Sequence, residues 1–281
     1  MGLNIVVCVK PIPDPKYYNE ITIDPVTKTV KRQGIPTIIN PIDKHAIEKA
    51  LKIKEQHGGK VILMSMAPPD AQETLLEGLA MGADETYLLS DRKFAGADTL
   101  ATSYVLARGI QKIGEIDLVL TGTESGDGAT AQVSSQLGEW LGFSHLWGVV
   151  NCEVKSQDDI YLKTKIENGY MEWSGKLPMV FAVSREINTP RYTSIMGVMK
   201  AKKKPFTIWS FQDLDLDEVY VGLKGSPTQP GDIFSPDMGR KGEILKISKE
   251  EAVELIIEKL RANGINIESF FSGCVRGERN E

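Results

Sequence analysis

The stretch Thr121-Gly-Thr-Glu-Ser-Gly-Asp-Gly-Ala-Thr-Ala-Gln-Val133 follows the apolar run Ile116-Asp-Leu-Val-Leu120 and leads into a helix-forming stretch that ends near Leu141. A buried strand that opens through glycines into a helix is how a parallel α/β sheet holds a phosphate, because amides at a helix start lack partners. Three glycines would let the backbone approach an anion closely: Gly122, Gly126 and Gly128. Three hydroxyl groups add donors: Thr123, Ser125 and Thr130. The stretch is neither a Walker loop nor GxGxxG, so an ordinary glycine-rich connection is the alternative.

Composition is that of an ordinary globular protein, with 41% hydrophobic and 25% charged residues. The net charge of −5 argues against a nucleic-acid partner, and the short basic run Lys200-Ala-Lys-Lys-Lys204 is typical of a solvated surface. No apolar run approaches the roughly 20 residues of a membrane span, and no signal peptide precedes the strand-like Leu3-Asn-Ile-Val-Val7. The cysteines Cys8, Cys152 and Cys274 show no metal-ligand spacing. We therefore expect a cytoplasmic, disulfide-free protein without direct membrane insertion.

The first half of the chain alternates between strand and helix patterns. Buried strands are predicted at residues 4–9, 60–66, 85–89 and 117–121. One helix begins at Asn40-Pro41, an N-cap followed by proline, and ends at Gly58-Gly59. Two more are predicted at residues 69–81 and 98–113. This alternation predicts an α/β fold with a Rossmann-like, doubly wound, mostly parallel sheet and helices on both faces.

Beyond Gly142 the pattern changes. Residues 149–155, 161–166 and 170–173 predict antiparallel strands, with Asn168-Gly169 as a hairpin turn, and residues 177–183 predict a further buried strand. From Glu186 the chain reads as an irregular, proline-rich arm, which usually indicates a function or a partner. A last helix starts with the capping box Ser248-x-x-Glu251 and has an apolar face that we expect to pack on this chain or on a partner. The tail 266–281 has no clear period, which is compatible with disorder, and its role is left open.

Several motifs occur in an order that matches a known family. They are Val7-Cys-Val-Lys-Pro-Ile-Pro-Asp14, Asn40-Pro-Ile-Asp43, Ala80-Met-Gly-Ala-Asp84, Asp127-Gly-Ala-Thr-Ala-Gln-Val133, Pro190-Arg-Tyr-x-Ser-Ile195 and Met199-Lys-Ala-Lys-Lys-Lys204. Over roughly residues 3–265 the chain resembles the β subunit of an electron-transfer flavoprotein. The resemblance implies a heterodimer with an α subunit that carries its own FAD, and an adenine nucleotide bound in the sheet of this chain.

In many members of that family the nucleotide is AMP. In the electron-bifurcating members it is a second FAD, which takes a hydride from NADH. One electron then goes to the α-subunit FAD and on to an acyl-CoA dehydrogenase or a quinone-reductase-type flavoprotein, and the other to ferredoxin or flavodoxin. Two segments resemble the bifurcating branch: Ser90-Asp-Arg-x-Phe-x-Gly-Ala-Asp-Thr-Leu-Ala-Thr-Ser103, and Pro11-Ile-Pro-Asp14, although Pro15 replaces the usual threonine.

We therefore predict a bifurcating, FAD-binding β subunit, located in the cytoplasm and associated with a membrane only through its partners. An AMP-binding, non-bifurcating β subunit is the nearest alternative. A free-standing ATP-using protein of the universal-stress type is a remote one. It would need a lysine or a metal-binding carboxylate at the phosphate loop, where residues 122–128 offer only Glu124 and Asp127.

The nucleotide site that the resemblance implies falls on two sets of residues. One set is Cys8, Asn40, Pro41, Asp43 and Met66, and the other is the run Gly122, Thr123, Glu124, Ser125, Gly126, Asp127, Gly128, Ala129, Thr130, Ala131, Gln132, Val133 and Ser134. If FAD is bound, the helix start with Asp98, Thr99 and Thr102 is the candidate for contacts with the diphosphate or the ring.

Each candidate also has a plainer interpretation. Helix capping alone would explain Asn40, Asp43 and Asp98. Cys8 and Met66 would supply shape rather than chemistry. A carboxylate repels phosphate, so we expect Asp127 to cap the following helix or to point away, with nearby amides doing the binding.

Residues 186–199 resemble the family's recognition loop, which inserts an apolar side chain into a pocket of a partner dehydrogenase. The implied docking residues are Pro190, Arg191, Tyr192, Ile195 and Met196, with Ile195 as the anchor. The alternative is that Ile195 packs under its own loop. No side chain reads as a catalytic acid, base or nucleophile, and flavin chemistry needs none, because the cofactor carries it. The resemblance thus divides the chain into a nucleotide-binding α/β domain (1–185), a recognition loop (186–206), an extended arm with the C-terminal helix (207–265) and a tail (266–281).

Overall fold

The computed structural model of the chain describes residues 2–20, 22–23, 30–31, 34–156, 158–229, 231, 242, 244 and 246–265. Residues 1–233 form one compact unit and residues 234–281 a second. The predicted tail 266–281, with Cys274, lies outside the described residues.

A mostly parallel sheet forms the centre of the first unit. In the described part of the chain, nine strands pair in the order β11–β10–β9–β12–β8–β1–β6–β7–β13. The four strands predicted in the first half are present as β1 (Leu3–Cys8), β6 (Gly59–Met66), β7 (Glu85–Leu89) and β8 (Leu118–Gly122). They pair in parallel, and their aliphatic side chains are buried because helices cover both faces. The expected doubly wound fold is confirmed.

The sheet continues into an antiparallel extension. β12 (Met179–Val183) is parallel to β8, and β9 (Ser144–Val154) pairs in parallel with β12 through its first half and antiparallel with β10 (Asp159–Ile166) through its second. β11 (Gly169–Lys176) closes a hairpin with β10. The pairing of Ile166 with Gly169 makes Glu167-Asn168 the two-residue loop, one residue earlier than the predicted turn.

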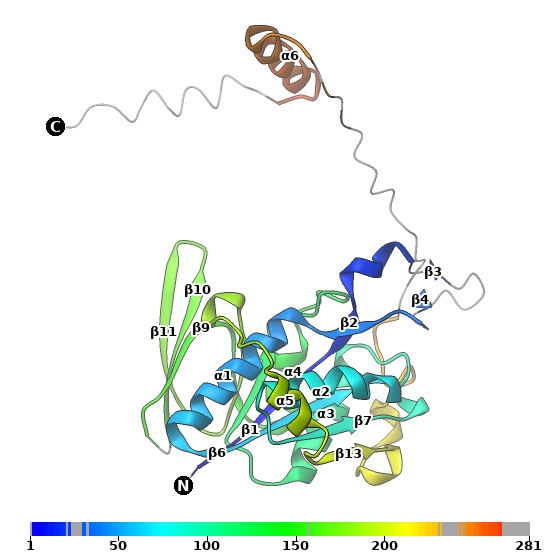
Figure 1. The fold of residues 1–281 in the computed structure, drawn as a ribbon, viewed down its shortest axis with the longest axis vertical. Coiled ribbons are helices and arrows are strands. Elements are labelled where there is room, and N and C mark those ends of the chain that lie inside the picture. The colour runs from blue at the N-terminus through cyan, green and yellow to red at the C-terminus, as the bar shows by residue number, and fades with distance from the viewer. Residues whose placement is uncertain are drawn as a thin grey trace, which may run out of the picture. The chain divides into compact units, whose positions relative to one another are not determined.

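Helices cover the two faces of the sheet separately (Figure 1). On one face lie α1 (Pro41–His57), α2 (Gln72–Met81) and α5 (Ile195–Ala201), whose buried side chains share a core with β1 and β6. On the other face lie α3 (Thr99–Ile113) and α4 (Val133–Leu141), which build a second core. Each strand thus buries alternate side chains in two different cores.

The region after residue 185 is more regular than predicted. It contains α5 and the strand β13 (Phe206–Trp209), which pairs in parallel with β7 at the sheet edge. The short helical turns η5 (Phe211–Asp213) and η6 (Glu218–Tyr220) follow, and Leu214 and Val221 are buried in the second core. Residues 206–221 therefore pack onto the sheet unit, and describing them as an irregular arm was wrong.

Smaller elements complete the first unit. They are β2 (Pro11–Pro13) paired with β5 (Thr37–Ile39), β3 (Thr22–Ile23) paired with β4 (Val30–Lys31), and the turns η1 (Pro15–Glu20), η2 (Pro69–Ala71), η3 (Arg92–Phe94) and η4 (Arg185–Ile187).

The second unit contains α6 (Lys249–Ala262). Its predicted capping box is confirmed: Ser248 Oγ accepts from the Glu251 amide, and the Glu251 carboxylate accepts from the Ser248 amide at 2.9 Å. Val253 and Ile256 on this helix are exposed. Among the helices that the structure describes, none combines the length and the apolar character needed to cross a bilayer.

Candidate functional site

A cavity of about 870 Å³ opens at the carboxyl ends of the central parallel strands. Cys8 ends β1, Met66 ends β6 and Gly122 ends β8, and all three line it. β1 lies between β6 and β8, so the chain winds outward from β1 in both directions. Open α/β sheets bind ligands at this kind of switch point. Because β2 directly follows β1, the cavity lies at the end of the sheet toward β2 in Figure 1.

Most of the residues predicted for a nucleotide site line this one cavity. They are Cys8, Asn40, Asp43, Met66, Asp98, Thr99, Thr102, Gly122, Thr123, Glu124, Ser125, Gly128, Thr130, Ala131, Gln132, Val133 and Ser134. Four members of the predicted set are not among the lining residues: Pro41, Gly126, Asp127 and Ala129. Sequence reasoning missed several that are, namely Val9, Lys10, Phe94, Gly96, Ala97, Leu106, Thr121 and Thr228.

Asp43 joins the ends of two neighbouring strands. Its Oδ2 accepts from the amide of Lys10, just beyond β1, at 2.8 Å, and its Oδ1 accepts from the amide of Gly122, at the end of β8, at 3.1 Å. The side-chain amide of Asn40 donates to Oδ1 at 3.0 Å. Asp43 is buried in the first turn of α1, and burial raises the pKa of its carboxyl to about 7.

Asn40 stands at the N-cap position of α1, but its side chain makes no capping hydrogen bond. Its Nδ2 also donates to the Glu124 carbonyl at 2.8 Å, and its Oδ1 accepts from the Gly126 amide at 3.3 Å. The capping interpretation of the Asn40 side chain was therefore wrong. Asn40 and Asp43 instead bind the loop that follows β8 to the start of α1.

The loop that follows β8 is longer than expected. α4 begins only at Val133, so residues 123–132 form a loop rather than the first turn of a helix. Two glycines, Gly122 at the end of β8 and Gly126 within the loop, lie close to other side chains. A Cβ on Gly122 would lie 2.4 Å from Asp43 Oδ1, and one on Gly126 would lie 3.1 Å from Ile12 Cδ1. A side chain at Gly122 would therefore clash with Asp43, and one at Gly126 would crowd Ile12.

Backbone conformation in this loop is unusual. Ala129 and Ala131 have φ of 50° and 57°, in the left-handed region that non-glycine residues rarely adopt. Each costs on the order of 1–3 kcal/mol, and such residues cluster at functional sites. Changes of backbone hand turn successive amide groups toward a common side, as in anion-binding concavities.

Lys10 and Asp127 form an ion pair beside the loop. Lys10 Nζ lies 2.6 Å from Asp127 Oδ1 and 3.2 Å from Ser125 Oγ. Asp127 is not the N-cap of α4, which is Gln132, and it is not among the residues that line the cavity; its carboxylate binds a lysine that follows β1. The sequence did offer one signal for Lys10, because it directly follows a predicted buried strand, and open α/β sheets bind ligands beyond the carboxyl ends of their strands.

The other end of the cavity is built around the start of α3. Asp98 Oδ1 accepts from the amides of Leu100 and Ala101 at 3.0 Å, which confirms it as a helix cap. Its Oδ2 accepts from the Thr228 amide at 3.0 Å. Burial acts to raise the pKa of Asp98, but these backbone hydrogen bonds outweigh it and lower the pKa. Asp98 thereby holds a distant segment, with Thr228, at the cavity wall.

Both polar and apolar residues line the cavity. Ser134 is one of the lining residues and is only 4% exposed, and its hydroxyl is buried without a hydrogen-bond partner among the described residues. An unpaired buried polar group costs about 1–3 kcal/mol, and Ser65 and Thr86, which do not line the cavity, carry such hydroxyls as well. Apolar walls for a planar ring come from Met66, Phe94 and Leu106. Apolar walls with a few polar groups are typical of cofactor sites.

The segment that carries the predicted docking residues is fastened to α1. Arg191 Nε and Nη1 donate at 2.7 Å to the carboxylates of Glu48 and Glu55, and the Arg191 amide donates to Glu48 at 3.1 Å. Glu48 is only 3% exposed, and both carboxylates raise the pKa of Arg191. His45 Nδ1 lies 2.9 Å from the Asn188 carbonyl, and the Asn188 side chain donates to the His45 carbonyl at 2.9 Å. Arg191 thus holds the segment in place.

The neighbouring apolar side chains face solvent. Ile195 is 84% exposed, and Tyr192 and Met196 are also exposed. Ile195 is the first residue of α5, which Ser194 caps through a hydrogen bond from the Gly197 amide at 3.0 Å. The alternative that Ile195 packs under its own loop was wrong, and so was its placement in a loop.

Comparison of the sequence with known proteins identifies the family to which this chain belongs. The model of the electron transfer flavoprotein domain matches residues 27–214. The electron transfer flavoprotein subunit beta of Thermoanaerobacterium thermosaccharolyticum is 43% identical over 264 residues, which cover 94% of this chain and all of the relative. The caffeyl-CoA reductase-Etf complex subunit CarD of Acetobacterium woodii is 43% identical over 265 residues, with the same coverage. Protein FixA of Azorhizobium caulinodans is 34% identical over 284 residues, covering 98% of this chain and all of the relative.

Proposed function

Because this chain belongs to the electron transfer flavoprotein family as a β subunit, we propose that its cavity binds FAD and that it acts in electron bifurcation with an α subunit. When bound, the flavin supplies the redox chemistry: a hydride is taken from NADH, and electrons pass to the α-subunit FAD and to ferredoxin or flavodoxin. The chain itself binds and orients the cofactor, with different residues at the two ends of the cavity.

One observation carries the choice of FAD over AMP. The cavity is continuous from the loop after β8 to the start of α3, so residues 94–102 line the same space as residues 122–134. Its volume of about 870 Å³ lies in the upper part of the roughly 300–1,000 Å³ range of small-molecule sites, which favours a dinucleotide. The segment at the α3 end is also the one that resembles bifurcating sequences.

The residues at the two ends suit different parts of the cofactor. At the end near β8, loop amides offer donors to phosphate, while Asn40 and Asp43 fix the loop that presents them. At the α3 end, Thr99 and Thr102 offer hydroxyl groups beside the apolar Phe94. Thr99 Oγ1 donates to Gln132 Oε1 at 3.1 Å, so the two ends are tied to one another.

Partners of this chain follow from the same assignment. An α subunit is implied by the relatives that are named as β subunits. We assign the exposed side chains Tyr192, Ile195 and Met196 to the docking of an acyl-CoA dehydrogenase or a quinone-reductase-type flavoprotein. The name of the CarD relative, which places it in a complex with a reductase of an acyl-CoA, supports the first of these. In this proposal residues 186–206 serve recognition, the C-terminal helix α6 contacts the α subunit, and the complex works in the cytoplasm, reaching a membrane only through its partners.

The nucleotide content of the purified complex tests the proposal. The chain should be purified together with its α subunit, extracted, and analysed by mass spectrometry alongside flavin absorbance. Two FAD per heterodimer, with flavin bleaching on titration with NADH, is the expected result. One FAD and one AMP would make this subunit a scaffold and docking partner and would refute the hydride-accepting role. The family match gives no support to the universal-stress-type interpretation, which would require ATP turnover by the isolated chain.

A further inference from the structure

Lys10 is the single cationic side chain among the described residues that line the cavity. It follows β1 at the switch point, and its side chain, 45% exposed, reaches across to Asp127 and Ser125 of the loop after β8. A Cβ placed on Gly128 would lie 3.6 Å from its Nζ, so the ammonium lies against the same stretch of loop that includes the left-handed Ala129.

Negatively charged side chains outnumber positively charged ones in the cavity wall, so the Lys10 ammonium is the group best suited to attract an anion. Three carboxylates line the cavity: Asp43, Asp98 and Glu124. Asp43 and Asp98 are engaged by backbone amides, and Glu124 is exposed, yet the wall still carries more negative than positive groups. An anion that enters such a site needs a nearby cation. A lysine ammonium binds phosphate as a mobile point charge with three donors.

We propose that Lys10 is the phosphate-binding cation of this cavity and that Asp127 competes with the nucleotide phosphate for the same ammonium. The inference rests on the proposed function, because it concerns the ligand of that cavity. The flexible stem of Lys10 lets the ammonium turn from Asp127 toward the cavity without moving the backbone. Asp127 then sets the affinity, since its ion pair with Lys10 must be given up when phosphate binds.

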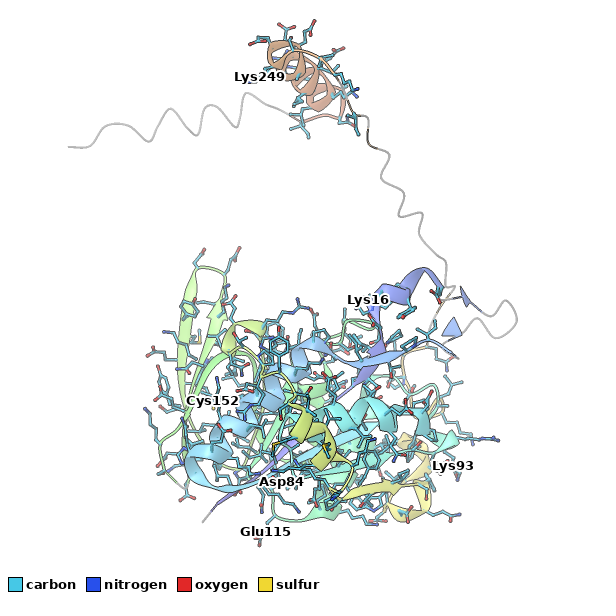
Figure 2. The ribbon with its side chains drawn as sticks, viewed as in Figure 1. Lys16, Asp84, Lys93, Glu115, Cys152 and Lys249 are labelled. Atoms are coloured by element: carbon cyan, nitrogen blue, oxygen red, sulfur yellow. The ribbon has the colours of Figure 1, made fainter. Side chains whose placement is uncertain are left out.

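The chain contains a matched control for this ion pair. Lys60 and Glu85 are also 2.6 Å apart, and the side chains of both pairs are 45% and 10% exposed. Lys60 and Glu85 line, together with Glu115 (labelled in Figure 2), a smaller pocket at the amino ends of the strands. A general loss of surface charge or stability would therefore affect Lys10→Met and Lys60→Met alike.

The test uses the complex with the α subunit, freed of bound nucleotide, and measures binding of AMP and of adenosine by equilibrium dialysis. The wild type should prefer AMP to adenosine, and Lys10→Met should lower AMP affinity by about tenfold while leaving adenosine affinity unchanged. Lys10→Arg should keep the preference, and Lys60→Met should match the wild type. Asp127→Asn should raise AMP affinity by roughly two- to fivefold, as expected for loss of a partly exposed ion pair. Added salt should weaken AMP binding to the wild type more than to Lys10→Met.

Different results would overturn different claims. If the wild-type complex binds AMP and Lys10→Met retains the same preference for AMP over adenosine, the role of Lys10 is refuted while the proposed function stands. If Asp127→Asn binds AMP no more tightly than the wild type, competition by Asp127 is refuted. If the wild-type complex binds neither AMP nor FAD, both the proposed function and the role of Lys10 are refuted.

Discussion

Gly122→Ala tests the junction between α1 and the end of β8. An added Cβ would lie 2.4 Å from Asp43 Oδ1 and 3.0 Å from Ile42 Cγ2, and Cβ contacts under 3.0 Å are essentially never found in proteins. The carboxylate would have to move by at least about 0.6 Å, away from the amides of Lys10 and Gly122 that it accepts from. Overpacking costs about 1–3 kcal/mol, and a buried amide left without an acceptor costs about 1–3 kcal/mol more.

We therefore expect Gly122→Ala to lower the free energy of unfolding by roughly 3 kcal/mol, which moves the urea midpoint down by about 1 M at an m value of about 3 kcal/mol/M. Gly128→Ala is the matched control in the same loop. Its Cβ would meet only the Ser125 hydroxyl at 3.2 Å and Lys10 Nζ at 3.6 Å, both on side chains that can move. The stabilisation of about 0.4–1 kcal/mol that alanine brings by restricting the unfolded chain is common to both variants. Equal urea midpoints for the two would refute the role assigned to the contact between Gly122 and Asp43.

Three further predictions concern other parts of the molecule. Because burial raises the pKa of Asp43 to about 7, its contribution to stability is complete below about pH 4 and is lost as the pH rises through about 7. The urea midpoint of Asp43→Asn should accordingly fall less with pH than that of the wild type, and parallel curves would contradict this. Arg191→Ala should cost about 2 kcal/mol in urea unfolding, because it strips the buried Glu48 of its main partner, whereas the exposed Arg185→Ala should change stability by less than about 0.5 kcal/mol. Ile195→Ala should leave stability and bound nucleotide unchanged but slow electron delivery to the partner dehydrogenase, and undiminished coupled turnover would show that Ile195 is not the anchor.

Sequence patterns predicted the parts of the fold that local rules determine. Three of the four buried apolar runs are followed by a polar residue or a glycine, and all four became parallel strands. β13 was missed because Phe206–Trp209 is only four residues long and is a strand through pairing with β7, more than a hundred residues earlier. Neither its length nor its composition separates it from an irregular segment.

In the candidate site, too, sequence patterns predicted local contacts but not contacts between residues far apart in the chain. Asp98 was correctly expected to cap α3, because a cap bonds to amides two and three residues away. Asn40 looks equally like a cap, yet its side chain binds Glu124 and Gly126, more than eighty residues away. The pair formed by Lys10 and Asp127 spans 117 positions. Such contacts depend on which strand ends become neighbours, and that is a property of the sheet order rather than of any local pattern.

The segment that follows β12 has one side that is hydrogen-bonded to α1 and another that is exposed to solvent. Arg191 and Asn188 on the inner side are bonded to α1, so they cannot change without a cost in folding. Tyr192, Ile195 and Met196 on the outer side are exposed, and the fold places few demands on them. Under the proposed docking role, substitutions at the outer residues alone would change the partner surface while the cavity and the stability of the subunit stay as they are. The contacts that hold the segment on α1 are thus made by different residues from those proposed to contact the partner.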